Sequence, residues 1–446
     1  MSESGCSYRR TIPHGINEVL KTHQNDLIIR ELSDRLVEAQ RPIRILDAVK
    51  WDESVRTDFF QKECKELPLV SAEHYAKRPL GFDTEQKRAE FQQLELDIKR
   101  KLGEYSPVGT IMRRMCREYT EAVRMIEARG TPEFARLSQE LYGSAHDVFY
   151  LGEPTLADFG EMMSEALTAV DTAGLFKAEP KDIPANEAVE ILKARLAESL
   201  PNPHIPIEVK LSDGIIADAA AGSDYIKLRA DAMFNERDLR LIEVHEGWVH
   251  VATTLNGLIQ PVCTFLSKGP PSSTVTQEGL AIFVENLSFA THPQRLRRVS
   301  NRIRAVAMTE DGANFLEIFR FYREQGLSDE ESYTNTHRVF RGSTPEGQPF
   351  TKDVCYSKGF ILVYNYIQLA VRRGMLDRIP LLFCGKTTLG DLRTIRHLIE
   401  EGVVIPPTSL PPQIADLQGL TAWMCYSSFI RHLNLNHIEA EVAQLF

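Results

Sequence analysis

The stretch Val244-His245-Glu246-Gly247-Trp248-Val249-His250 decides the fold that this sequence predicts. It places a glutamate directly after one histidine and a second histidine five positions after the first. A hydrolytic zinc site needs two imidazoles to hold the metal and one carboxylate to take a proton from the metal's water. The common zinc-peptidase motif has its histidines four positions apart on one helical face. The extra residue in this stretch therefore needs a structural explanation.

The spacing of five predicts a distorted helix. At 3.6 residues per turn, positions i and i+4 lie about 40° apart around an α-helix, whereas i and i+5 lie about 140° apart. A single π-bulge widens one turn by one residue and returns His250 to the face of His245. Gly247 lies inside the interval and can accept a distorted backbone. The alternative is a chance pattern in a buried helix, with Trp248 as a packing residue.

The composition is that of a soluble globular protein, because 43% of the 446 residues are hydrophobic and 26% are charged. A net charge of −10 argues against general nucleic-acid binding. The seven cysteines are scattered and form no C-x-x-C pair, which favours a reducing cytoplasm over a disulfide framework. The N-terminus has no secretory signal, and the most apolar stretch, 249–266, contains several polar residues. We expect a cytoplasmic protein without a membrane partner.

Hydrophobic periodicity predicts an α+β fold that is mainly α. Helical patterns fill the first 150 residues, and the chain after residue 257 is again mainly helical. Between them we expect a small antiparallel sheet, followed by a long helix that begins at Asn235 and is ended by Asn256-Gly257. Strands that lead into a metal-binding helix are the order of zincin-like metallopeptidases. The N-terminal helices are expected at 16–39, 91–102 and 108–126, and the strands at 207–211, 215–219 and 225–229.

Two regions are expected along the chain. Residues 1–185 form a helical N-terminal support region in which nothing suggests chemistry. Residues 186–446 form the metallopeptidase catalytic region, and we expect the two regions to pack as one unit.

The stretch Gln277-Glu278-Gly279-Leu280-Ala281 provides a candidate for the third protein ligand that a catalytic zinc usually has. Glu278 lies in the first turn of an expected helix, and the small Gly279 and Ala281 would let this helix approach the His245 helix. A glutamate in a first turn is also common because the helix dipole favours it there. Glu285, seven residues on, is the rival ligand; we place it behind the metal, orienting a histidine N–H.

With these residues quoted, the chain resembles a known family. The Gln277–Ala281 stretch is the motif that names the flavohemoglobin expression-modulating QEGLA motif proteins of bacteria. These are similar to the microtubule-associated tyrosine carboxypeptidases of animals, which remove a C-terminal tyrosine from tubulin. The resemblance covers roughly residues 201–398. It implies a zinc metallopeptidase fold in which His245, His250 and Glu278 bind zinc and Glu246 is the general base.

Candidate substrate-binding residues follow further along the chain. A carboxypeptidase must neutralise a free C-terminal carboxylate, and Arg338 and Arg341 lie three apart in an Arg-Val-x-Arg-Gly stretch that the resemblance includes. We expect Tyr356 to stabilise the oxyanion and Lys352 to contact a carboxylate or a structural partner. The alternatives are a solvated basic helix end for the arginines and an ordinary core position for Tyr356. His337 could also donate to an oxyanion, but we read it as a structural histidine.

We interpret two further motifs as structural rather than functional. The arginines of residues 293–304 are expected to form a solvated helix face rather than a site for an acidic peptide or nucleic acid. The stretch Cys384-Gly385-Lys386-Thr387 ends like a phosphate-binding loop, but Pro380 occupies the position of the first glycine. We therefore expect no nucleotide binding.

The sequence thus predicts a zinc-dependent peptidase, most simply a metallocarboxypeptidase whose substrate is a peptide or protein C-terminus. One alternative is a non-catalytic regulatory or peptide-binding protein on the same fold. Another is a different zinc hydrolase, such as an amidase. The complete ligand set and the retained Glu246 favour the enzyme, because a binding module has no need of a base.

Overall fold

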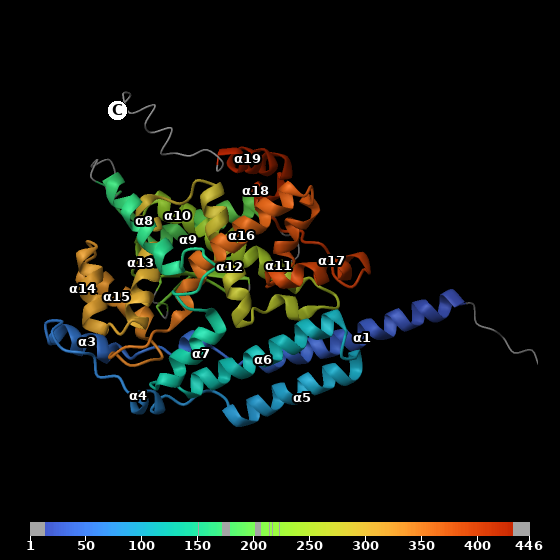
Figure 1. Ribbon diagram of the computed structural model, residues 1–446, viewed down its shortest axis with the longest axis horizontal. Coiled ribbons are helices and arrows are strands. Elements are labelled where there is room, and N and C mark those ends of the chain that lie inside the picture. The colour runs from blue at the N-terminus through green and yellow to red at the C-terminus, as the bar shows by residue number, and fades with distance from the viewer. Residues whose placement is uncertain are drawn as a thin grey trace, which may run out of the picture.

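The computed structural model describes residues 14–149, 151–171, 179–200, 207–213, 215, 217–222 and 224–430. This part of the chain is mainly helical with two small sheets, as the sequence predicts (Figure 1). None of its helices combines the length and apolar character that crossing a membrane requires.

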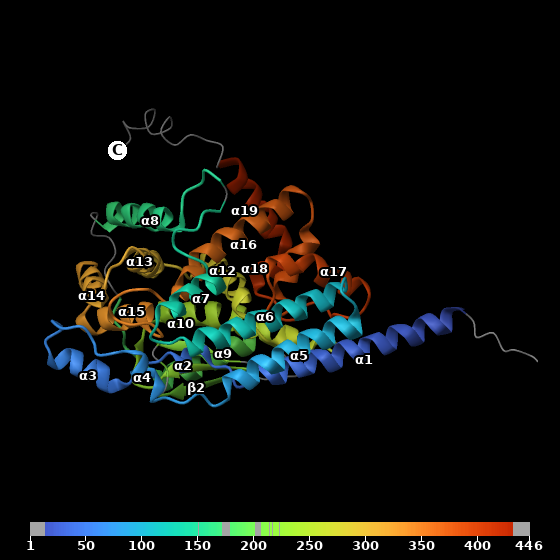
Figure 2. The same cartoon turned by 60° about the horizontal axis from the view of Figure 1, so that its bottom comes forward.

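The N-terminal helices confirm the expected periodicity. Ser106 begins α6 by accepting the Gly109 N–H on its hydroxyl, and Pro107 takes the first helical position, where a missing N–H costs nothing. Helices α1, α5 and α6 lie side by side along the lower part of the molecule in Figures 1 and 2. The N-terminal elements are α1 (His14–Gln40), α2 (Ile45–Ala48), α3 (Glu53–Gln61), α4 (Ala72–Ala76), α5 (Thr84–Leu102), α6 (Pro107–Glu127), α7 (Pro132–Tyr142) and α8 (Leu156–Asp171).

A three-stranded sheet has the order β2-β4-β3, with β2 (Glu208–Ser212), β3 (Ala219–Ala221) and β4 (Tyr225–Arg229). The antiparallel prediction is confirmed for β3 and β4 but is wrong for β2 and β4, which run parallel. The reason is that β2 and β3 are the two edge strands and β4 lies between them. The chain therefore reaches the far edge of the sheet before it returns along the middle, in the same direction as β2. The second strand also begins later than expected; Gly214 and Ile216 lie outside the described residues.

A second, two-stranded sheet pairs β1 (Ile183–Pro184) with β5 (Met233–Phe234) in antiparallel register. Helix α9 (Ala185–Ser199) follows β1 directly. Its buried Leu192 and Leu196 belong to the same hydrophobic cluster as Ile226 of β4, so this helix packs beside the sheet.

The predicted long helix begins where expected, because Asn235 and Asp238 form a reciprocal capping box. It consists of α10 (Glu236–Ile242), the π-helix η1 (Glu243–Val251) and α11 (Ala252–Leu258). Asn256 does not stop it. Its side chain instead donates to the carbonyl oxygens of Phe383 and Ser409, at 2.9 and 2.8 Å. The helix therefore continues three residues past the predicted end.

Two glycines let α12 (Pro271–Leu287) and α16 (Cys355–Arg372) cross in close contact. A Cβ atom on Gly279 would lie 2.0 Å from the carbonyl carbon of Gly359, and one on Gly359 would lie 1.9 Å from the Val275 oxygen. We expected Gly279 to bring α12 close to the His245 helix. That expectation is wrong for this residue, because the position that a side chain of Gly279 would occupy faces α16.

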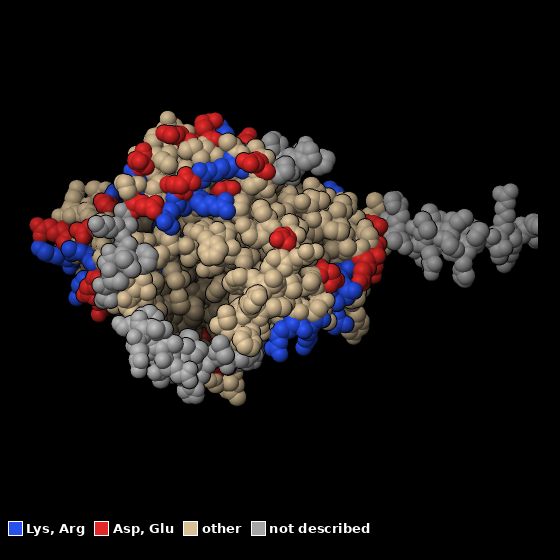
Figure 3. Space-filling model, turned by 90° about the horizontal axis from the view of Figure 1, so that it is seen from above, with Lys and Arg blue, Asp and Glu red and all other residues tan. Residues whose placement is uncertain are grey.

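The remaining C-terminal helices are α13 (Pro293–Glu310), α14 (Phe315–Glu324), α15 (Asp329–Phe340), α17 (Leu392–Glu400), α18 (Pro412–Ala415) and α19 (Leu417–Ile430). Short 3₁₀ helices lie between the helices from α11 onward: η2 (Thr264–Ser267), η3 (Thr351–Val354), η4 (Leu376–Arg378), η5 (Pro380–Phe383) and η6 (Leu389–Asp391). One hydrophobic cluster runs from Leu32 of α1 to Met424 of α19, so the N-terminal helices and the later ones share a core. Seen from above, the molecule has a hollow, and the described residues at its rim are mainly uncharged (Figure 3).

Candidate metal centre and cleft

The π-helix η1 brings His245 and His250 together. Their Nε2 atoms lie 3.2 Å apart, although an unbroken α-helix would place the two side chains about 140° apart around its axis. The predicted bulge between the two histidines is therefore confirmed. Gly247 has a packing role in addition, since a Cβ atom there would lie 2.3 Å from Leu196 Cδ2 of α9.

Glu278 of α12 completes a cluster with the two histidines, in which His245 and Glu278 are buried and His250 is partly buried. Its Oε2 atom lies 3.4 Å from His245 Nε2 and 3.5 Å from His250 Nε2. Tetrahedral zinc, with ligand distances of about 2.1 Å, would place its ligand atoms about 3.4 Å from one another. Glu278 Oε2 is buried and accepts no hydrogen bond from any described residue. The three side chains could thus hold a metal ion.

Glu285 contacts the His245 ring on the side away from the cluster. Its Oε1 atom lies 2.5 Å from His245 Nδ1, and Arg295 donates to both oxygens of the same carboxylate, at 2.9 and 3.1 Å. Burial would raise the pKa of Glu285, but Arg295 and His245 outweigh it and lower that pKa to about 2. A charged Glu285 keeps a proton on His245 Nδ1, so Nε2 is the ring nitrogen that faces the cluster and that a metal would take in place of its proton.

The cluster favours a positive charge at its centre. Burial would lower the pKa of His245, but contacts with the Glu278 and Glu285 carboxylates outweigh burial and raise this pKa to about 10. Lys352 supplies the nearest permanent cation, with its Nζ 3.3 Å from Glu278 Oε1.

Glu246 lies beside the cluster without being part of it. Its Oε1 atom is 4.0 Å from His245 Nε2, and its Oε2 atom accepts the Ala221 N–H at 2.8 Å. Ala221 ends the edge strand β3, so the sheet fixes the orientation of this carboxylate. The side chain lines the neighbouring cleft and remains available to a ligand bound there.

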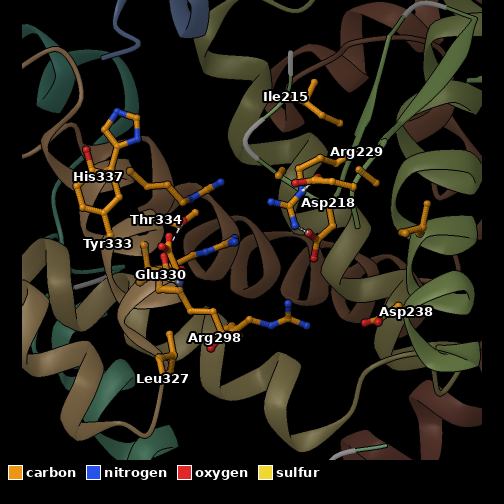
Figure 4. A pocket seen from close by; sticks show the side chains of 18 of the residues that line it. Ile215, Asp218, Arg229, Asp238, Arg298, Leu327, Glu330, Tyr333, Thr334 and His337 are labelled. Carbon is orange, nitrogen blue, oxygen red and sulfur yellow. Dashed lines mark hydrogen bonds and ion pairs between the residues drawn. The ribbon is translucent and has the colours of Figure 1, made fainter. Parts of the chain in front are cut away.

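A cleft with a volume of about 670 Å³ opens beside His245 and Glu246. Figure 4 shows two facing walls, one with Tyr333, His337 and Arg298 and the other with Asp218 and Arg229. The first wall belongs to α13 and α15, and the second to the sheet. The cleft is therefore bounded by parts of the chain about a hundred residues apart.

Four arginines line this cleft near the cluster: Arg295, Arg298, Arg302 and Arg338. The expectation of a solvated face on α13 is wrong, because Arg295 is buried and Arg298 and Arg302 are only partly accessible. The apolar residues between them, such as Val299 and Ile303, pull the same helix into the core. Spacings of three and four residues place these arginines of α13 on one face of the helix, but only the fold shows that α15 and the sheet cover this face.

Arg302 and Arg338 differ in how they are held. Arg338 forms a two-pronged pair with Asp353, at 2.9 and 2.8 Å. Arg302 lies over the ring of Tyr356 at 4.7 Å, and within the described chain its Nε and Nη1 atoms have no hydrogen-bond partner. Arg302 is therefore held less tightly than Arg338, since its Nε lies 3.9 Å from Asp353 Oδ2.

The remaining predicted substrate residues, Tyr356, Arg341 and Lys352, lie in three different places. Tyr356 lines the cleft, with its ring centroid 6.3 Å from that of His245. Arg341 does not line it; this buried guanidinium lies 5.5 Å from the Phe350 ring. Lys352 contacts Glu278 and lines a different, second cavity.

His337 also lines the cleft, within an aromatic surface. Its ring centroid is 4.8 Å from that of Trp51 and 6.2 Å from that of Tyr333. Burial, reinforced by Arg341 and Arg338, lowers the pKa of His337 to about 3, so the ring is neutral. Its Nε2 atom has no hydrogen-bond partner among the described residues.

Lys386 is a site residue that the sequence did not reveal. Its Nζ donates to the carbonyl oxygen of His250 at 2.8 Å, to Gln277 Oε1 at 2.9 Å and to Thr253 Oγ1 at 3.0 Å. It therefore links the two helices that carry the cluster. Gly385, at a φ of 141°, makes the turn that places it. The Cys384–Thr387 motif is thus a structural turn beside the cluster.

Residues 57–432 match the sequence model of the family described as microtubule-associated tyrosine carboxypeptidase. The chain belongs to this family. The match includes the N-terminal helices from α3 onward, so it is longer than the resemblance seen in the motifs alone. Membership supports a peptidase function of the carboxypeptidase class.

Other comparisons are more distant. Trypanosoma cruzi metallocarboxypeptidase 1 is 13% identical in sequence, with a TM-score of 0.40, over 94% of this chain and 99% of that one. A likeness at this level carries no argument about the site. No curated protein sequence matches the chain.

Proposed function

We propose that this family member is a zinc-dependent carboxypeptidase that releases the last residue of a peptide or protein. The observation that carries the proposal is the His245, His250 and Glu278 cluster, with Glu246 beside it in an arginine-lined cleft. A second candidate function, binding without catalysis, has no comparable observation in its favour.

Zinc is the metal we propose, since two imidazoles and one carboxylate are a common catalytic zinc donor set. His245, His250 and Glu278 would hold it, and Glu285 would fix the tautomer of His245. When bound, zinc supplies a Lewis acid and lowers the pKa of water, so that hydrolysis can proceed near neutral pH.

Glu246 is the proposed general base. Its carboxylate takes the proton from the attacking water and later gives it to the leaving amine. The Ala221 N–H holds one oxygen at 2.8 Å and so aims the other into the cleft. Tyr356, which lines the same cleft, is the proposed donor to the oxyanion of the scissile carbonyl.

The terminal carboxylate of the substrate is assigned to the arginines of the cleft. Arg298 projects into it, and Arg302 lines it as well. Arg338 contributes charge from its pair with Asp353. Arg341 is too deeply placed for direct contact, and we assign Lys352 to positioning Glu278.

The family name suggests tyrosine as the residue released. The rings of Trp51, Tyr333 and His337 form a surface that could receive an aromatic side chain. A cytoplasmic location is part of the proposal, because the described cysteines are all free thiols.

A pair of peptides that differ only in a free or an amidated C-terminus tests the proposal. The zinc-loaded chain should release the last residue of the free acid and leave the amide intact, and chelation should abolish release. Glu246→Gln protein should bind the same amount of zinc and release the residue far more slowly. Zinc without turnover in the parent chain would instead establish a binding protein, and cleavage of both peptides would establish an endopeptidase.

A further inference from the structure

The side-chain amine of Lys386 makes three hydrogen bonds close to the metal cluster. Its Nζ donates to the carbonyl oxygen of His250 at 2.8 Å, to Gln277 Oε1 at 2.9 Å and to Thr253 Oγ1 at 3.0 Å. These three acceptors match the three N–H donors of a lysine ammonium group. Lys386 does not line the cleft, so it is placed to act on the protein rather than on a substrate.

Two of the three acceptors are tied to residues of the metal cluster. His250 belongs to the cluster through its ring, and Lys386 holds the main chain of the same residue. Gln277 directly precedes Glu278, the carboxylate of the cluster, on α12. A single side chain therefore fixes the position of η1 relative to α12, the two elements whose side chains would share one metal ion.

The His250 carbonyl lies where the helix changes its geometry. The π-helix η1 ends at Val251, the residue after His250, and α11 follows with regular α-helical turns. The same carbonyl oxygen accepts hydrogen bonds from the hydroxyl groups of Thr253 and Thr254, at 3.1 and 2.8 Å. Side-chain donors thus stabilise the main chain at the end of the turn that brings the two histidines together.

The main chain at Lys386 is itself held in place. The Lys386 N–H donates to the carbonyl oxygen of Leu266 at 2.7 Å. A Cβ atom on Gly385 would lie 2.4 Å from that oxygen, and a Cβ atom on Gly257 of α11 would also lie 2.4 Å from it. The turn that carries Lys386 and the helix α11 therefore pack against the same carbonyl group, which fixes the one relative to the other.

We propose that Lys386 is a positioning residue that sets the separation of His250 and Glu278 and thereby the affinity of the cluster for zinc. This inference rests on the proposed function, because it concerns the same metal ion. Lys386 acts through the His250 carbonyl and the Gln277 side chain and is not itself a ligand. A nearby cation opposes the binding of a metal ion, so a role through charge and a role through position change the zinc affinity in opposite directions.

Zinc titration of the metal-free full-length chain, in competition with a chromophoric chelator, tests this role. Lys386→Met keeps the length of the side chain and removes its donors. It should raise the zinc dissociation constant about 10- to 100-fold, the usual effect of losing a group that orients a metal ligand. Lys87→Met is the matched control, because Lys87 is also partly buried but is paired with Glu90 on α5, and it should bind zinc as the parent does.

Cobalt(II) in place of zinc provides a second measurement, since its visible absorption reports the coordination geometry of the ion. The band should be weaker in Lys386→Met than in the parent and in Lys87→Met, because a displaced His250 leaves the ion to water. A purely structural role would lower the stability in urea and leave both the band and the zinc dissociation constant of the folded protein unchanged.

Gln277→Met is the second variant. It removes the contacts of α12 with Lys386 and Thr253 and leaves the bond from Lys386 to His250 in place. It should raise the zinc dissociation constant less than Lys386→Met does, and it decides the question if Lys386→Met protein does not fold.

Two results separate this inference from the proposed function. Zinc affinity equal to that of the parent, or higher, in folded Lys386→Met protein would overturn the inference and leave the proposed function standing. The same result in Gln277→Met has the same meaning where Lys386→Met does not fold. A parent chain that binds no zinc would overturn the proposed function, and the inference with it.

Discussion

Glu285 accepts the Nδ1 proton of His245 at 2.5 Å while Arg295 holds both oxygens of the same carboxylate. This arrangement fixes the ring of one predicted metal ligand from the side opposite the metal. Glu285→Gln should therefore raise the zinc dissociation constant about 10- to 100-fold, as measured by competition with a chromophoric chelator. Glu310→Gln is the control, because the Glu310 side chain is also largely inaccessible to solvent but accepts hydrogen bonds from Ser144 and Ala145 instead. Equal zinc affinity in the two variants would contradict the role of Glu285.

Glu246→Gln should separate metal binding from catalysis. Loss of a general base should lower kcat by about 10²- to 10⁴-fold, while zinc content stays at one ion per chain. Release of the C-terminal residue and metal analysis of the same sample measure the two quantities. Glu243→Gln is a matched control on the same π-helix, since Glu243 is paired with Arg240 and does not line the cleft. A Glu246→Gln protein as active as the Glu243→Gln protein would rule out the proposed base.

Arg298→Gln should weaken recognition of the substrate's free carboxylate. Loss of one charge-assisted hydrogen bond, worth about 1.5–3 kcal/mol, should lower kcat/KM by about 10- to 100-fold for a free-acid peptide. Arg297→Gln is the control one position away, because Arg297 donates to the Leu167 carbonyl and does not line the cleft. If both variants lose activity alike, the effect comes from helix α13 rather than from the carboxylate contact.

Gly279→Ala should destabilise the fold around the metal centre. The new methyl group would meet the backbone of Gly359, which cannot move without separating α12 from α16. We expect a loss of roughly 2–4 kcal/mol of unfolding free energy, measured by urea denaturation. Gly81→Ala meets nothing within 4 Å and should leave the stability nearly unchanged. Gly279→Ala protein as stable as the parent would show that the helices do not pack as closely as described.

His337 should make the protein sensitive to acid. Its pKa is lowered from an ordinary 6.5 to about 3, so between these values the unfolded chain binds a proton that the folded chain does not. Stability should therefore rise with pH across this window and be lost as the pH falls through it. His337→Gln should flatten the dependence of Tm on pH between about 7 and 4, relative to the parent. An unchanged slope would show that His337 takes up its proton without unfolding.

The sequence predicts the parts of the site that depend on local spacing. The five-residue interval between His245 and His250 requires a π-turn in any helix that brings them together, and that turn is present. The prediction that the arginines of α13 face solvent is wrong, because their periodic spacing places them on one face of the helix but does not show what packs against that face. The parallel pairing of β2 with β4 is likewise set by where distant segments meet, which local patterns do not record.

The contribution of Lys386 could not be predicted for a similar reason. It lies more than a hundred residues after the residues that it contacts, His250 and Gln277, and its neighbours in sequence form an ordinary turn. Only the folded chain shows that the carbonyl oxygen of His250 and the side chain of Gln277 meet at that point. Charged residues that act through main-chain atoms leave no motif of their own.

Removing Gly247 would turn the motif into the common His-Glu-x-x-His pattern, and both histidines would then suit a regular α-helix. The same deletion would rotate everything after it by about 100° and shift it by about 1.5 Å along the helix. Asn256 would lose its partners at Phe383 and Ser409, and Thr253 would turn away from Gln277. The five-residue spacing of the histidines is thus required for the contacts of α11 as well as for the metal cluster. In this protein a spacing of four could not replace it.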